Sequence, residues 1–184
     1  ADHRSTLVVK NNLALLLVDH ADPAAGLALC QELLADRRRV LGESHPDVAQ
    51  SLMNLASAQA RNQDRAGAVL HSQQARDMYL ALLGPDNHDS VLATYQLALR
   101  EWQAGQLEPA QAHATQALAA YERLAEAPNE RGATRFLLAR ITWDLGQHPR
   151  AREIGAQALE EARPHGGPGF ELSEVQAWVS AHGG

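Results

Sequence analysis

The chain has 184 residues, of which 45% are hydrophobic and only 4% aromatic, a length sufficient for one domain with a sizeable core. Its formal net charge of −6 argues against a general binder of nucleic acids or acidic membranes, which would normally carry a basic face. Cys30 is the only cysteine, so no intramolecular disulfide can form.

The first predicted element is a helical hairpin over about residues 5–41. Apolar residues recur at helical spacing along its first arm, at Leu7, Ala14, Leu15 and Val18. The pair Asp22-Pro23 marks the turn, because Asp is a favourable N-cap and Pro fits the first helical position. The second arm ends with three consecutive arginines, residues 37–39. Cations at a helix C-terminus complement the helix dipole, and nucleic-acid contact is the alternative interpretation.

Three further hairpins follow, over about residues 46–83, 87–126 and 129–163. The second begins at His45-Pro46, where Pro forces the preceding residue into an extended conformation. Its turn is predicted at residues 62–64, Asn-Gln-Asp, because these residues tolerate left-handed or capping geometry. Gly105 and Gly146 lie between apolar-periodic segments and mark the turns of the third and fourth hairpins.

The clearest break in the chain is the Pro- and Gly-rich stretch of residues 164–169. After it, apolar residues recur on one helical face, at Leu172, Val175, Trp178 and Val179. A stack of helical hairpins needs a cap over its last member, because an open end would expose the core. We therefore expect a capping helix over about residues 170–182 and treat residues 1–184 as a single domain.

The four hairpins repeat one pattern. Leu97-Ala98, Ala110 and Ala117 recur 42 positions earlier and, with Leu138-Ala139, 41 positions later. Small residues are needed where two helices approach closely. The pattern resembles the tetratricopeptide repeat, which is usually about 34 residues long. The joints Leu41-Gly42 to His45-Pro46 and Leu83-Gly84 are similar to those of the kinesin light chain type of this family. The resemblance implies an all-α, right-handed superhelical solenoid of four hairpins plus a C-terminal capping helix.

Motifs of catalysis are sparse, and we expect no enzyme, no cofactor and no metal site. The nine histidines include no pair at ligand spacing on a helix with an acidic partner. Neither a phosphate-binding glycine loop nor a nucleophile elbow is present. No apolar run approaches the ~20 residues of a membrane span. No signal peptide is visible, so we expect a cytoplasmic protein. The chain begins with Ala rather than Met, which indicates either a trimmed chain or a fragment of a larger protein.

The resemblance also places certain residues of each first helix on the inner face of the solenoid, where related repeats bind extended peptides. Three of these residues are carboxamides, which can both donate to and accept from a peptide main chain: Asn12, Asn54 and Gln96. The other candidates are mostly apolar or aromatic: Met53, Tyr95, Leu99, Trp102, Phe136, Arg140 and Trp143. The alternative is that the carboxamides bond within the solenoid and that the tryptophans pack under the next hairpin.

The resemblance implies a scaffold that binds a protein or peptide in its concave groove, with the aromatic residues as anchors. The alternative is a regulatory or sensory segment of a larger bacterial signalling protein, either a Ser/Thr kinase or a transcription regulator. The closing residues 172–182 are similar to the tails of kinase-linked repeats. We expect no nucleic acid and no membrane as partners. Self-association and the identity of the partner are left open.

Overall fold

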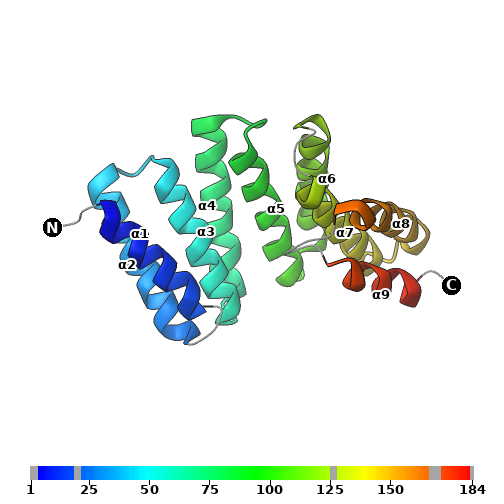
Figure 1. Cartoon of the computed structure of the whole chain (residues 1–184), viewed down its shortest axis with the longest axis horizontal. Helices are drawn as coiled ribbons and strands as arrows, with labels where there is room; N and C mark the ends of the chain where they lie inside the picture. The colour runs from blue at the N-terminus through cyan, green and yellow to red at the C-terminus, as the bar shows by residue number, and fades with distance from the viewer. Residues whose placement is uncertain (1–3, 19–21, 125–127, 166–170, 183–184) are drawn as a thin grey trace. The chain divides into compact units, whose positions relative to one another are not determined.

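The computed structural model describes residues 4–18, 22–124, 128–165 and 171–182, and in these residues it contains helices and no strand (Figure 1). The helices are α1 Arg4–Leu16, α2 Pro23–Leu41, α3 Pro46–Arg61, α4 Arg65–Leu83, α5 His88–Gln103, α6 Leu107–Leu124, α7 Pro128–Asp144, α8 His148–His165 and α9 Leu172–His182. The predicted all-α class is therefore confirmed. The contacts divide the chain into two compact units, residues 1–84 and 85–184.

Side-chain caps begin several of these helices. The carboxylate of Asp22 accepts hydrogen bonds from the backbone N–H groups of Ala24 and Ala25 at 3.1 Å each, with Pro23 at the first helical position as the sequence predicts. His45 is extended, with φ −147° and ψ 143°, and its Nδ1 accepts from the backbone N–H of Asp47. Each cap satisfies N–H groups that have no partner inside the helix.

The hairpin turns need left-handed backbone at the positions predicted from the sequence. Gly105 and Gly146 both have φ of +77°, a region that side chains with a Cβ rarely occupy. The turn between α3 and α4 has no glycine. There Gln63 adopts φ of +64°, and Asp64 caps α4 by accepting from the N–H of Gly67. Gln63 thus stands at the repeat position of Gly105, and it adopts the same left-handed conformation.

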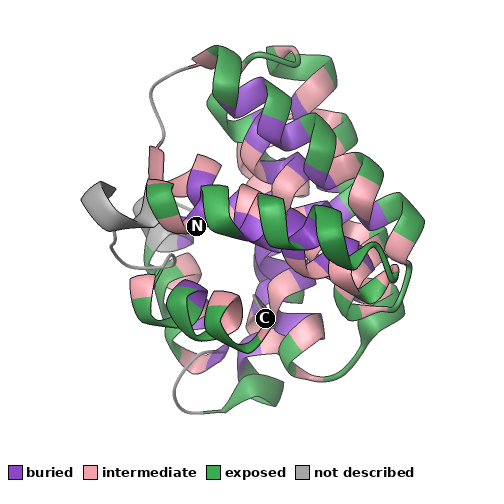
Figure 2. Cartoon of the chain, turned by 90° about the vertical axis from the view of Figure 1, so that its right-hand side faces the viewer, coloured by how far each residue is buried: buried purple, intermediate pink, exposed green. Residues whose placement is uncertain are grey.

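The recurring alanines lie where helices touch. In the first unit, the recurring Ala56, Ala68 and Ala75 are buried, and Ala75 packs in a core with Cys30 and Leu52. In the second unit, Ala98, Ala110 and Ala114 are 0% exposed and pack with Leu138 and Ile141. Buried and exposed residues alternate along the helices that lie toward the viewer in Figure 2. The small side chains let helix backbones approach closely, which a larger residue would prevent.

A polar pair also closes two of the hairpins at equivalent repeat positions. In the α3–α4 hairpin, His71 Nδ1 lies 2.7 Å from Gln59 Oε1. Forty-two residues later, in the α5–α6 hairpin, His113 Nδ1 lies 2.7 Å from Glu101 Oε2. Gln59 and Glu101 are buried, so the imidazole supplies a partner that a buried polar group requires.

The arginine run of α2 is occupied by contacts within the first unit. Arg37 is buried, and its guanidinium donates to the backbone carbonyl of Asp47 at 2.9 Å and to Ser51 Oγ at 2.8 Å, so it links α2 to α3. Arg38 pairs with Glu43, and Arg39 pairs with Asp36. Through Arg37 the run therefore joins α2 to α3, and its positive charges also complement the dipole of α2.

The last helix, α9, packs on α8 through a glycine contact. A Cβ built on buried Gly155 would lie 2.4 Å from a ring carbon of Trp178. The same indole meets Phe136 edge to face, with ring centroids 5.9 Å apart, and Val175 of α9 is fully buried beside them. Helix α9 thus covers the apolar face of the last hairpin, as expected of a capping helix.

We expect Ala110→Leu to destabilise the protein by about 1–3 kcal/mol, because the larger side chain overpacks the contact between neighbouring helices. Ala112→Leu is the matched control, since Ala112 lies exposed on the same helix. Urea denaturation followed by circular dichroism measures both variants. Equal midpoints for the two variants would contradict the placement of the recurring alanines at helix contacts.

We expect Gly155→Ala to lower stability, although alanine normally stabilises a helix interior by about 1 kcal/mol relative to glycine. The new methyl group would displace the Trp178 ring and loosen α9. Thermal unfolding monitored by tryptophan fluorescence measures the effect. Ala156→Gly, at the adjacent exposed position, is the control that measures the ordinary difference between the two residues in this helix. A higher melting temperature for Gly155→Ala would show that α9 does not depend on this contact.

Candidate functional site

A small pocket in the second unit gathers four of the sequence-predicted site residues. Its volume is about 90 Å³ and its lining is Tyr95, Leu99, Ala133, Phe136, Leu137, Arg140 and Glu174. Residues 95 and 99 are four apart on α5, and residues 133, 136, 137 and 140 follow one face of α7. Helical spacing therefore explains why these side chains converge.

The cation of the pocket is held by aromatic rings and by one carboxylate. The guanidinium carbon of Arg140 lies 4.3 Å from the ring centroid of Trp102 and 5.5 Å from that of Phe136. Arg140 Nη1 also donates to Glu174 Oε1 at 3.1 Å. Cation–π contacts fix the plane of the guanidinium group, so its remaining N–H donors have defined directions.

Trp102 supports this arrangement from the side. Its indole Nε1–H donates to Asp144 Oδ2 at 2.7 Å, a bond from α5 to the C-terminal end of α7. The indole therefore has a fixed orientation and presents its face to Arg140. Trp102 thus acts on the pocket through Arg140, although it is not among the lining residues.

Tyr95 is partly buried and contacts two apolar clusters of the second unit. Burial raises the pKa of its phenol above the ordinary value, against the opposing influence of Arg100 and Arg140. The phenol therefore stays neutral at physiological pH and offers a ring plus a hydroxyl. An aromatic side chain with one polar atom is a favourable anchor for a binding partner.

Trp143 lies elsewhere in the second unit, against the capping helix. Its ring stacks on His148 at 4.1 Å and meets His182 edge to face at 4.3 Å and Trp178 at 6.0 Å. Trp143 therefore packs against the capping helix and not against a further hairpin. Gln96, also in this unit, is partly buried, and its Oε1 lies 3.5 Å from Arg100 Nη2.

In the first unit, the predicted carboxamides behave differently from one another. Asn54 is buried: its Nδ2 donates to Asn11 Oδ1 at 2.7 Å, and its Oδ1 accepts from Gln50 Nε2 at 3.0 Å. The bond to Asn11 joins α3 to α1, whereas the bond from Gln50 lies within α3. Asn12, by contrast, is exposed, and Met53 is half-buried against the core of this unit. Of the two predicted carboxamides, Asn12 is therefore the more accessible.

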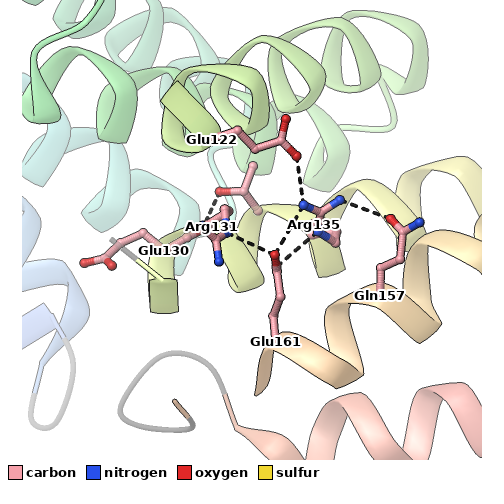
Figure 3. Close-up of polar contacts among 7 residues, drawn as sticks. Glu122, Glu130, Arg131, Arg135, Gln157 and Glu161 are labelled. Atoms are coloured by element: carbon pink, nitrogen blue, oxygen red, sulfur yellow. Dashed lines mark hydrogen bonds and ion pairs between the residues drawn. The ribbon is translucent and has the colours of Figure 1, made fainter. Parts of the chain in front are cut away.

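A charged network on α6, α7 and α8 is satisfied internally, as Figure 3 shows. Arg135 pairs with Glu122 at 2.8 Å and with Glu161 at 3.1 Å, and it also donates to Gln157. Arg131 pairs with the same Glu161 at 3.0 Å. Because each guanidinium already has carboxylate partners, this network holds three helices together rather than forming a binding site.

Sequence reasoning missed Glu174 and Ala133 as lining residues of the pocket. Ala133 shares the α7 face with Phe136 and Leu137, so helical periodicity could have found it. Glu174 lies on α9, 34 residues after Arg140 in the sequence. No repeat spacing relates the capping helix to α7, and therefore the sequence pattern contains no indication of this contact.

The described part of the chain offers little chemistry besides this pocket. Within those residues, no group of three or more His, Cys, Asp or Glu side chains is placed to hold a metal ion. Burial raises the pKa of the Cys30 thiol to about 11, so the thiol is protonated at neutral pH. None of the described helices combines the length and apolar character needed to cross a bilayer.

Comparisons with known proteins agree with the repeat pattern. Residues 5–81 match the tetratricopeptide repeat family. The match spans the first two predicted hairpins and agrees with the repeat pattern predicted there. No curated protein sequence matches the chain.

Solved structures extend the similarity of fold to nearly the whole chain. A Podosopora anserina protein described as a kinesin light chain with nearly identical TPR-like repeats aligns with a TM-score of 0.82 and 21% identity, over 99% of this chain and 87% of that one. BtubC (BKLC) from P. vanneervenii aligns with a TM-score of 0.80 and 19% identity, over 96% of this chain and 71% of that one. The helical-repeat solenoid fold predicted from the sequence is thereby confirmed.

Aspartyl phosphate phosphatase F from Bacillus subtilis has the same fold at a TM-score of 0.81 and 16% identity. The alignment covers 96% of this chain and 45% of that one. At such low identity, the similarity shows the fold alone and says nothing about shared partners.

We expect Asn54→Ala to destabilise the protein by about 1–3 kcal/mol, because it leaves Asn11 and Gln50 without their buried partner. Asn12→Ala should change stability by less than about 0.5 kcal/mol, since Asn12 is exposed. Chemical denaturation measures the free energy of unfolding of both variants and of the wild type. Equal stability of the Asn54→Ala and Asn12→Ala proteins would show that the hydrogen bonds of Asn54 contribute nothing.

Proposed function

We propose that this chain is a protein- or peptide-binding scaffold and that the Tyr95–Arg140 pocket anchors its partner. The pocket itself carries the proposal: aromatic and aliphatic walls surround a single oriented cation. Tetratricopeptide repeats typically mediate protein–protein interactions, so the fold supports a binding role. Surfaces that bind proteins commonly concentrate their affinity in a few aromatic and arginine residues.

The size of the pocket favours a side-chain anchor over a bound small molecule. At about 90 Å³, it is well below the roughly 300–1,000 Å³ of pockets that enclose small ligands or cofactors. It has room for about one apolar side chain of a partner. The rest of the partner would then lie across exposed surface, where Gln96 and Trp102 are partly accessible.

In the first unit, we propose that two residues, Asn12 and Met53, contribute to binding. Asn12 is exposed and retains a carboxamide that can bond to a peptide main chain. Met53 is half-buried and offers an adaptable apolar surface. Because Asn54 is already bonded to Asn11 and Gln50, its role would be to position this surface.

The alternative of a regulatory segment in a larger bacterial signalling protein, a kinase or a transcription regulator, stays a prediction. It is compatible with a binding scaffold, because such a segment also acts by contacting other proteins. The residues that would carry partner contacts are the same in both cases.

A binding partner is first captured with the wild-type chain. We expect Tyr95→Ala to weaken the binding of this partner by about 2 kcal/mol, which raises its Kd roughly 30-fold, because the substitution removes an anchoring ring. Isothermal titration of wild-type and variant chains against that partner measures the loss. Leu70→Ala is the control, since Leu70 is 52% exposed on α4, outside the pocket. Circular dichroism must first show that both variants are folded. Wild-type affinity in folded Tyr95→Ala would exclude the pocket as the anchor.

A further inference from the structure

We propose that α9 is a latch on the pocket, in which Glu174 occupies the carboxylate site of Arg140 and must be displaced by a ligand carboxylate. This inference rests on the proposed function and adds a means of regulating the same pocket. It follows from three features of the second unit: the orientation of Arg140, the weak hold on Glu174, and the attachment of α9 to the pocket wall.

Arg140 is oriented as a receptor for a carboxylate. Two aromatic rings hold its guanidinium, at 4.3 Å from Trp102 and 5.5 Å from Phe136, and this packing leaves the N–H edge of the group for polar partners. A planar guanidinium is well suited to bind a carboxylate. In the structure the carboxylate is Glu174, whose Oε1 accepts from Arg140 Nη1 at 3.1 Å.

The hold on Glu174 is weak enough for exchange. Its side chain is 59% exposed, and that of Arg140 is 35% exposed, so water and salt screen the pair. Exposed ion pairs of this kind typically change an equilibrium by no more than about fivefold. A ligand that supplies its own carboxylate together with an apolar group for the pocket can therefore replace Glu174.

The attachment of α9 couples this carboxylate to the shape of the pocket. Phe136 lines the pocket and also meets Trp178 of α9 edge to face. Trp178 in turn rests on Gly155, and Val175, next to Glu174, is fully buried. Docking of α9 thus places Glu174 at Arg140 and packs against one wall of the pocket at the same time.

The partner class follows from this chemistry: a peptide that presents one carboxylate beside an apolar side chain. N-acetyl-leucine is a minimal probe for that pair of groups, and N-acetyl-leucinamide is its uncharged counterpart. Each probe is titrated into the 184-residue chain while NMR records the Arg140 Nε–H and the Trp102 indole N–H. The variants are Glu174→Gln, which removes the competing charge, and Glu153→Gln, which removes a charge from an exposed position of α8.

We expect Glu174→Gln to bind N-acetyl-leucine about two- to fivefold more tightly than wild type, with no change for N-acetyl-leucinamide. Glu153→Gln should match wild type for both probes. Arg140→Gln should lose the preference for the carboxylate probe. Equal affinity of wild type and Glu174→Gln for N-acetyl-leucine, or no shift at Arg140 in either protein, would overturn the latch.

The two proposals fail separately. Loss of the latch leaves the affinity of the captured partner and its dependence on Tyr95 as they are. An equal gain for both probes in Glu174→Gln would show that Glu174 only blocks space, which would also overturn the carboxylate exchange. A partner that binds Tyr95→Ala as tightly as wild type would remove the proposed function, whatever the probes show.

Discussion

The close approach of helices at small residues is the constraint on which the rest of the structure depends. Alanines at the repeat positions of α3–α4 and α5–α8 are almost completely buried, and each allows neighbouring helices to touch. Fixed contact points of this kind set which helical faces remain available. On α5 and α7, the faces left over carry Tyr95, Leu99, Phe136 and Arg140, which form one pocket. The binding surface is therefore a consequence of the packing.

Within each unit, polar contacts then determine the orientation of the helices that the alanines bring together. Arg37 joins α2 to α3 through the Asp47 carbonyl and Ser51, and Asn54 joins α3 to α1 through Asn11. In the second unit, Arg135 ties α7 to α6 and α8. Buried or half-buried polar groups of this type are costly unless every donor finds an acceptor, so they favour a single arrangement.

The sequence predicted the fold well because the repeat acts through local rules. Gly105 and Gly146 take the left-handed conformation that their positions indicated, and Asp22 and His45 cap the helices they precede. The candidate site was harder to predict. Tyr95, Leu99, Phe136 and Arg140 do converge, whereas Trp143 packs against α9 and Asn54 is bonded within its unit.

Periodicity could not distinguish these outcomes, because it places a residue on a face without saying what covers that face. Glu174 is the clearest example: it contacts Arg140 only because Trp178 of α9 fits against Gly155 of α8. That fit depends on side-chain shapes in two helices outside the pocket. A contact of this kind lies beyond what a repeat pattern encodes.

Hydrogen–deuterium exchange of the full chain with and without its captured partner tests the central claim most directly, because it reports the contact surface without any substitution. We expect new protection in α5 around Tyr95 and Leu99 and in α7 around Phe136 and Arg140, together with changed exchange in α9. Protection confined to the second helices of the hairpins, α2, α4, α6 and α8, with α5 and α7 unchanged, would contradict it.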